Sequence, residues 1–177
     1  MTSTGNILLI TGKPGIGKTT VIKKVVNALS DRRINGFYTE EIRVHNVRRG
    51  FALIPLEGKP LVMAHVDSDS AYRVGKYGVD VNAIDAAVAM TLADERQADV
   101  FIVDEIGKME CFSDLFVQRM SFLLDSDNPV VATVALKGGG FIAEVKKRTD
   151  AVLWEVTRKN RDEIPARIVA WVRERLA

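Results

Sequence analysis

The amino-acid sequence predicts an α/β fold in which helices cover both faces of a mostly parallel sheet. Short apolar runs alternate along the chain with segments whose apolar residues recur at helical spacing. The 177 residues are enough for one domain with a substantial core, and no linker, repeat or low-complexity tract divides them. We therefore expect residues 1–177 to form a single domain, a three-layer sandwich built from right-handed β-α-β crossovers.

The first strand and helix are the clearest elements. The run NILLIT at 6–11 is apolar and bounded by turn residues, which predicts a buried strand. From Lys18 onward a helical stripe follows, made of Val21, Ile22, Val25, Val26 and Leu29.

An antiparallel extension is expected next, at one edge of the sheet. Residues 36–44, 50–56 and 60–66 are aromatic and β-branched, and the short links HNVRR and EGKP have turn chemistry. Residues 36–66 should therefore form hairpins inside the same domain. We expect 67–80 to be a loop, and its RVGKYGV stretch to be a flexible segment that could serve as a lid.

The remaining chain repeats the alternation of helix and strand. The expected elements are a helix through Ile84, Val88 and Leu92, a strand at 99–107, a helix through Leu115, Phe116, Met120, Leu123 and Leu124, a strand at 129–136, a short helix at 142–147, a strand at 151–157, and a last helix with Pro165 in its first turn. In such sheets ligands bind where the strands end. The loops after residues 11, 40, 104, 135 and 157 should line the site.

Composition and charge narrow the functional classes. The chain is 47% hydrophobic and 27% charged, with a net charge of +2, so a nucleic-acid partner is not expected. We interpret the basic runs at 48–49 and 146–148 as solvated faces. His45 and His65 have no partners at metal-binding spacing, so both are expected to be structural or surface residues.

Other features favour a cytoplasmic protein without a membrane partner. The N-terminal apolar run is far shorter than the roughly 20 residues that span a bilayer, and no basic segment precedes it. Cys111 is the single cysteine, so no disulfide can form within the chain. We interpret it as a small buried hydrophobe and not as a nucleophile.

A phosphate-binding loop follows the first strand. Its sequence fits G-x-x-x-x-G-K-[ST], with Gly12, Lys13, Pro14, Gly15, Ile16, Gly17, Lys18 and Thr19. The glycines allow successive backbone N–H groups to point at phosphate oxygens, and the helix start adds positive potential. Lys18 would reach the β- and γ-phosphates, Thr19 would ligate Mg²⁺, and Thr20 would add a hydroxyl at the α-phosphate. A plain glycine turn is the alternative reading.

Two acids end the strand at 99–107. Asp104 would hold Mg²⁺ through its water shell, as the second half of a P-loop site. Glu105 would accept a proton from the water that attacks the γ-phosphate, or orient that water. The alternative is a pair of surface acids that cap a strand.

Other candidates are less specific. In YTEE one of Thr39, Glu40 and Glu41 would face the γ-phosphate or its metal, although alternation along a strand explains them equally well. In TRKNRD, Arg158 and Arg161 would stack on the base or neutralise phosphate charge, and Asn160 would bond the base; the alternative is a loop that only leads into the last helix. Lys108 and Arg148 are further candidates for offsetting transition-state charge.

These motifs together resemble a known family. GKPGIGKTT, GFYTEEIR, RVGKYGV, VDEIGKME and EVTRKNRD, in this order, look like the small THEP-type P-loop nucleoside-triphosphatases, called cancer-related NTPases in vertebrates. The resemblance covers nearly the whole chain. It implies a RecA-like P-loop fold and slow Mg²⁺-dependent hydrolysis of nucleoside triphosphates with many bases, with diphosphates attacked less well. It also implies nucleotide contacts from residues 12–19 and from Ile102, Val103, Asp104, Glu105, Ile106, Gly107, Lys108 and Met109.

We therefore predict a hydrolase that cleaves the β–γ bond of ATP, GTP, CTP, UTP and TTP, with Lys18, Asp104 and Glu105 as catalytic residues and Thr19 and Asp104 as metal ligands. Two alternatives stay open. A nucleotide or small-molecule kinase shares the fold and the loop, but 67–80 is short for an acceptor lid and Arg73 is its only arginine. A nucleotide-switched binding module, with weak hydrolysis, would present the hairpins at 36–66 to a protein partner.

Overall fold

A computed structural model describes residues 5–177 of the chain. In this part of the chain nine strands form one sheet, in the order β5-β6-β4-β3-β2-β7-β8-β1-β9. The strands are β1 Ile7–Thr11, β2 Ile34–Val44, β3 Val47–Pro55, β4 Leu61–His65, β5 Arg73–Val74, β6 Tyr77–Val79, β7 Val100–Ile106, β8 Val130–Val134 and β9 Ala151–Glu155.

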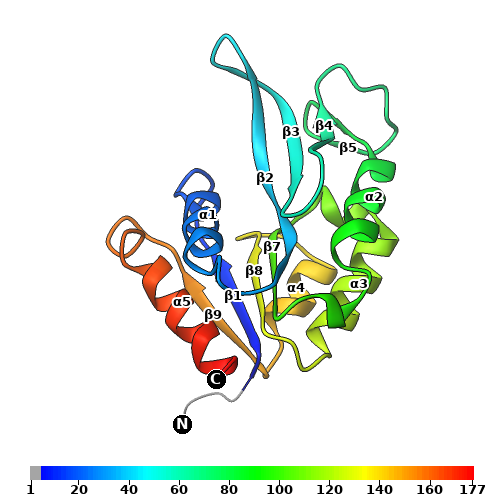
Figure 1. Cartoon of the computed structure of the whole chain (residues 1–177). Helices are drawn as coiled ribbons and strands as arrows, with labels where there is room; N and C mark the ends of the chain where they lie inside the picture. Colours follow the sequence, from blue (N-terminus) through cyan, green and yellow to red (C-terminus); the bar gives the residue numbers. More distant parts are fainter. Residues whose placement is uncertain (1–4) are drawn as a thin grey trace.

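The sheet has a parallel half and an antiparallel half. Strands β2, β7, β8, β1 and β9 are parallel neighbours. On the other side of β2, the strands β3, β4, β6 and β5 pair antiparallel. The predicted mostly parallel sheet with an antiparallel extension at one edge is confirmed, and Figure 1 shows the β2–β3 hairpin projecting well beyond the other strands.

Five helices cover the two faces. They are α1 Lys18–Ala28, α2 Val81–Thr91, α3 Asp114–Leu124, α4 Phe141–Lys146 and α5 Ile164–Arg175, with short 3₁₀ turns at Glu95–Gln97 and Glu110–Phe112 in the described chain. Buried residues of α1 and α5 belong to one core cluster, and those of α2, α3 and α4 belong to another. The two groups stand on opposite sides of the sheet in Figure 1.

The alternation of side chains explains why the central strands are apolar throughout. In β1, Ile7 and Leu9 pack in the cluster under α2, α3 and α4, whereas Leu8 and Ile10 pack under α1 and α5. Successive side chains of a strand point to opposite faces, so a strand that is covered on both sides must be apolar at every position.

Two turns are tighter than the sequence predicts. The link between β2 and β3 is only His45 and Asn46, both at positive φ (47° and 63°), as in a two-residue hairpin turn. The segment expected to be a flexible loop contains the β5–β6 hairpin, because Gly75 adopts a φ of 57° at its turn and the following Tyr77 is buried in the core. The expectation of a loop throughout 67–80 was therefore wrong.

Candidate active site

The predicted phosphate-binding loop connects β1 to α1 at the carboxyl edge of the parallel strands. Gly17 precedes α1 with φ 112° and ψ 23°, and no side chain caps the helix. By contrast, α2 and α3 are capped by Asp80 and Ser113, whose side chains accept from backbone N–H groups of the first turn. The first N–H groups of α1 thus have no side-chain acceptor, which suits a bound phosphate.

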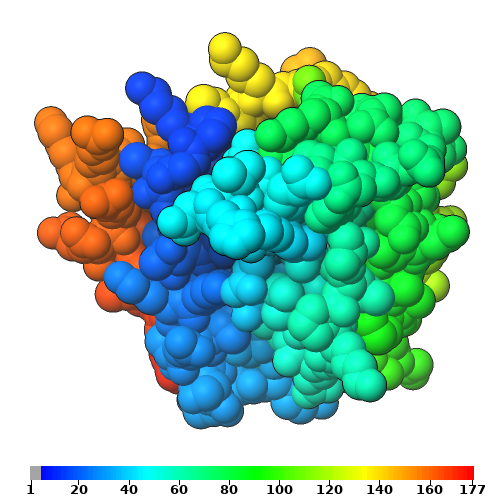
Figure 2. All heavy atoms as spheres, turned by 90° about the horizontal axis from the view of Figure 1, so that it is seen from above, coloured from blue at the N-terminus to red at the C-terminus, as the bar shows by residue number. Residues whose placement is uncertain are grey.

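Other loops surround the same edge. Figure 2 looks down on it and shows the phosphate-binding loop (blue), the β2–β3 hairpin (cyan), the loop after β8 (yellow) and the loop after β9 (orange). Gly12 lies against the last of these loops, because a Cβ atom on it would lie 2.8 Å from the carbonyl oxygen of Val156. The close approach requires glycine at this position.

The lysine of the loop folds back across it. Nζ of Lys18 donates to the carbonyl oxygen of Gly12 at 3.1 Å. An ammonium group has three donors, so two remain for phosphate oxygens.

Asp104 is the convergence point of the site. It is 1% exposed, and three threonines from three elements donate to its carboxylate. Oδ2 accepts from the hydroxyl of Thr19 on α1 at 2.7 Å and from the hydroxyl and amide of Thr39 on β2 at 3.3 and 3.4 Å. Oδ1 accepts from the hydroxyl of Thr133 on β8 at 2.5 Å. These bonds fix the carboxylate in one orientation.

The oxygens of Thr19 and Asp104 suit Mg²⁺, which prefers oxygen ligands and completes its shell with water and substrate phosphate. Their 2.7 Å contact shows that two oxygens from α1 and β7 already converge at one point. No cluster of three or more His, Cys, Asp or Glu side chains suited to a metal occurs among residues 5–177.

Glu105 and Glu110 form a second acidic pair. A Cβ atom on Gly107 would lie 2.7 Å from Oε1 of Glu105 and 2.9 Å from Oε2 of Glu110, so both carboxyl groups flank this glycine. Burial, and next the charge of Asp104, raise the pKa of Glu105, while Lys18 and Lys146 oppose the rise. A raised pKa makes Glu105 a better proton acceptor.

Glu110 is more deeply buried, with 4% of its surface exposed. Burial, with the charge of Glu105 second, raises its pKa to about 8, although backbone N–H groups of Glu110 and Gly107 bond the carboxylate. Its neighbour Cys111 is half-buried, and burial raises the pKa of that thiol to about 12. Such a thiol is protonated at neutral pH and is not a nucleophile.

Lys146 is a cation that the sequence interpretation placed on a solvated face. Its Nζ donates to the carbonyl oxygen of Leu136, just after β8, at 2.7 Å, and its charge acts on Glu105. The structure thus brings a second lysine, besides Lys18, toward the acids of the site.

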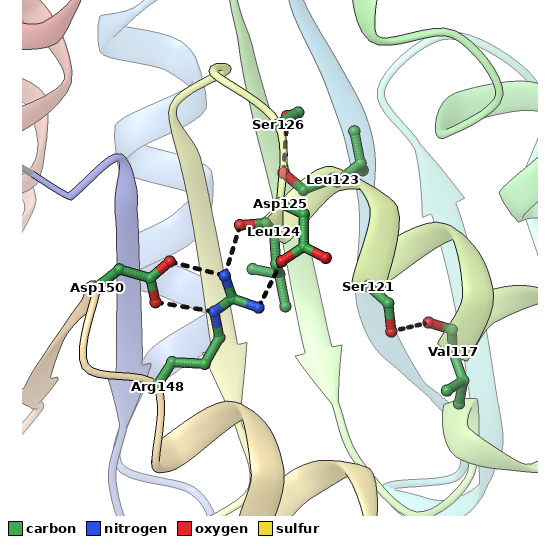
Figure 3. A network of polar contacts seen from close by, with 8 residues as sticks. All are labelled: Val117, Ser121, Leu123, Leu124, Asp125, Ser126, Arg148 and Asp150. Atoms are coloured by element: carbon green, nitrogen blue, oxygen red, sulfur yellow. Dashed lines mark hydrogen bonds and ion pairs between the residues drawn. The ribbon is translucent and has the colours of Figure 1, made fainter.

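Arg148, by contrast, is not brought to the site. Its guanidinium donates to Asp150, Asp125 and the carbonyl oxygen of Leu124 (Figure 3). Asp150 directly precedes β9, whose first residue pairs with Ile7 at the start of β1. Arg148 therefore lies near the amino ends of the parallel strands, whereas the phosphate-binding loop lies at their carboxyl ends. The expected charge-shielding role of Arg148 is corrected.

The loop after β9 only partly matches its predicted role. Oδ1 of Asn160 accepts from the amide of Thr157 at 2.8 Å, and its Nδ2 donates to the carbonyl oxygen of Glu155 at 2.8 Å. Its side chain thus holds the loop together and is engaged at both ends. Arg158 and Arg161 are exposed and follow the carboxyl end of β9, and Lys108 is exposed after the acids at the carboxyl end of β7.

The other predicted contact residues divide by burial. Lys13, Pro14, Gly15 and Thr20 are exposed on the loop and first turn of α1, whereas Ile16 packs against the core under α1 and α5. In the second segment the side chains of Ile102, Val103 and Ile106 are 0% exposed, and Gly107 and part of Met109 are also buried. Only Asp104, Glu105 and Lys108 of that segment present charged side chains.

Three residues of the site were missed by sequence reasoning: Thr133, Glu110 and Lys146. Thr133 had a detectable signal, because it is a hydroxyl residue in the otherwise apolar run VVATV beside the acidic strand. The strand of YTEE also continues to Val44 and does not end at residue 40, so no loop follows there. The hydroxyl of Thr39 nevertheless donates to Asp104, because β2 pairs with β7 up to Phe37 and Val103, close to both residues.

Comparison with known proteins places this arrangement in context. A family model described as NTPase matches residues 7–169. Nucleoside-triphosphatase THEP1 of Thermotoga maritima is 40% identical over 158 residues, covering 89% of this chain and 90% of that protein. The crystal structure of THEP1 from Aquifex aeolicus matches with a TM-score of 0.78 at 37% identity, covering 93% of this chain and 98% of that one. The solution structure of a human cancer-related nucleoside triphosphatase matches with a TM-score of 0.79 at 33% identity, covering 95% and 97%.

Proposed function

The chain belongs to the nucleoside-triphosphatase family that includes THEP1, and from this membership we propose that it is a Mg²⁺-dependent hydrolase of nucleoside triphosphates. The reaction transfers the γ-phosphoryl group to water and releases a nucleoside diphosphate and inorganic phosphate. Diphosphates would be weaker substrates. The observation that carries the proposal is the convergence of Thr19 on Asp104, beside the uncapped start of α1 and next to Glu105.

Each group has a defined task in this proposal. The loop amides and Lys18 bind the β- and γ-phosphates, and Thr19 and Asp104 would hold Mg²⁺. When bound, the ion would neutralise charge on the phosphate oxygens. Glu105 takes the proton of the attacking water or orients that water, and its buried setting favours proton acceptance. The charges of Lys18 and Lys146 act on Glu105. In this proposal the same two charges also stabilise the negative charge that develops on the phosphate beside Glu105.

Broad base specificity is part of the proposal. The loop after β9 has its only carboxamide, Asn160, engaged with its own backbone, which leaves the exposed Arg158 and Arg161 for a base. Stacking of a guanidinium plane on a base does not depend on which base it is. We expect ATP, GTP, CTP, UTP and TTP to be hydrolysed at comparable rates.

One observation bears on the kinase alternative. Arg73 donates to the carbonyl oxygens of Ser68 and Lys76, so it is used inside its own hairpin, which disfavours a kinase with an arginine-bearing lid. No helix in residues 5–177 has the length and apolar character needed to cross a bilayer.

The test is a panel of triphosphates and diphosphates, assayed for phosphate release with and without Mg²⁺ and with and without nucleosides or nucleotides as acceptors. The proposal expects acceptor-independent release that requires the metal. A kinase would release little phosphate alone and would phosphorylate an acceptor.

A further inference from the structure

Strand β2 leaves the parallel part of the sheet at the phosphate site. It pairs with β7 only from Ile34 to Phe37. From Tyr38 to Val44 its strand partner among the described residues is β3 alone. Beyond Phe37, strand β2 is therefore paired on one side only, and the tip of the β2–β3 hairpin projects beyond α1 in Figure 1.

Two side-chain contacts tie this part of β2 to the phosphate-binding elements. The amide and hydroxyl of Thr39 donate to Oδ2 of Asp104 on β7. Glu40 pairs with Lys23 of α1, whose Nζ also lies 4.9 Å from the centre of the Tyr38 ring. Both contacts end on elements that carry a candidate metal ligand, because α1 begins with Lys18 and Thr19.

Among the hydrogen bonds to Oδ2 of Asp104, those from Thr39 are the most easily exchanged. Oδ2 receives Thr19 at 2.7 Å and the two donors of Thr39 at 3.3 and 3.4 Å, three donors for an oxygen with two lone pairs. The long bonds are the weak ones. A metal ion held by Thr19 and Asp104 would compete for the lone pairs of Oδ2. The two weak bonds from Thr39 would therefore be the first to change partner.

We propose that Thr39 is a positioning residue that links the triphosphate site to the β2–β3 hairpin, by exchanging its bond to Asp104 for one to an oxygen of the terminal phosphate. This inference rests on the proposed function. A diphosphate does not supply that oxygen, so the hairpin is held differently in the two nucleotide states. The surface that changes place is the hairpin tip, where Val44 and Val47 are 50% and 55% exposed.

Amide hydrogen exchange of residues 38–54 tests the link. The chain is measured with Mg²⁺ and a nucleoside diphosphate, and with Mg²⁺ and a non-hydrolysable triphosphate analogue. Calorimetry first confirms that both nucleotides bind. We expect exchange of amides in 38–44 to be about tenfold slower with the triphosphate analogue, the factor that one hydrogen bond to a charged group supplies.

Variants assign the effect to one hydroxyl. Thr39→Val keeps the side-chain volume and should remove most of the difference, whereas Thr39→Ser should keep it. Thr149→Val, at an exposed threonine next to Arg148, is the matched control and should behave like the unmodified chain. If Thr39→Val does not fold, Thr39→Ala removes the same hydroxyl and should likewise lose most of the difference, and a full difference retained in Thr39→Ala overturns the role of Thr39.

The outcomes separate the two proposals. Equal exchange with both nucleotides bound, or a full difference retained in Thr39→Val, overturns the role of Thr39 and leaves hydrolysis untouched. Failure of both nucleotides to bind the unmodified chain contradicts the proposed function itself.

Discussion

The hydroxyl of Thr133 on β8 donates to Oδ1 of Asp104 on β7 over 2.5 Å, and these two side chains are 0% and 1% exposed. The neighbouring strand thus holds one oxygen of the carboxylate, while the other oxygen accepts from Thr19 on α1. A buried carboxylate with this support holds its other oxygen toward α1 without the cost of reorienting when a ligand binds.

We predict that Thr133→Val raises the Mg²⁺ concentration needed for half-maximal phosphate release by about tenfold or more, because outer-shell partners of metal ligands typically have this effect. The loss of a buried hydrogen bond should also lower the free energy of unfolding by about 1–3 kcal/mol. Metal titration of activity and urea denaturation measure the two effects. Thr133→Ser keeps the hydroxyl and should restore the metal dependence; an unchanged Mg²⁺ requirement in Thr133→Val would remove this role.

Lys18→Ala should abolish measurable nucleotide binding or turnover. The substitution removes the cation that lies across the phosphate-binding loop, together with its bond to the carbonyl oxygen of Gly12. Calorimetric titration with a triphosphate, on protein whose folding is verified by circular dichroism, provides the measurement. Binding and phosphate release both close to those of the unmodified chain would contradict the assignment.

Lys146→Met should lower the rate of phosphate release by about tenfold or more, since a preorganised charge near the developing negative charge contributes at least this much. The affinity for a diphosphate should change little. Lys147→Met is the matched control, because that residue is exposed on the same helix end. Lys146→Arg should recover part of the rate. Equal rates for the Lys146 and Lys147 variants would show that Lys146 has no catalytic part.

Glu110 should make folding stability fall as pH rises through neutrality. Its folded pKa is about 8, well above the roughly 4.3 of an unfolded glutamate, so the native state binds the extra proton between these values. Stability is therefore highest at the acid end of this window and is lost as pH rises toward 8. From pH 6 to 9 the loss attributable to Glu110 should be on the order of 3 kcal/mol.

Glu110→Gln isolates that contribution. The variant should lose less stability than the unmodified chain between pH 6 and pH 9, measured by urea denaturation at each pH. Parallel stability curves for the two proteins would show that Glu110 does not titrate in this range.

The parallel half of the fold could be predicted from the sequence because burial on both faces leaves a continuous apolar signal. The five strands β2, β7, β8, β1 and β9 and all five helices of the described chain were expected near their observed positions. The β5–β6 hairpin was not expected, because strands of two and three residues carry no measurable periodicity. Its turn depends on one glycine conformation that only the structure reveals.

The site was predictable where chemistry is local in sequence. The phosphate-binding loop and the acids at 104–105 are short motifs, whereas Thr133 meets Asp104 across a separation of 29 residues. Lys146 and Arg148 are two positions apart, and sequence alone favoured Arg148. Helix α4 ends at Lys146, whose Nζ reaches back to the carbonyl oxygen of Leu136 near the carboxyl ends of the strands. Arg148 lies beyond the helix and is held by Asp125 and Asp150 near the amino ends.

Glu105→Gln tests the central claim most directly, because it changes one proton-accepting oxygen and leaves the proposed metal ligands in place. Phosphate release from a triphosphate is measured without any acceptor, with Mg²⁺ and with a chelator, alongside calorimetric affinity for the same nucleotide. We predict that the unmodified chain releases phosphate only with Mg²⁺, and that Glu105→Gln binds the triphosphate normally but releases phosphate about a hundredfold more slowly. Equal release by the two proteins, or release that is unaffected by the chelator, would contradict the account.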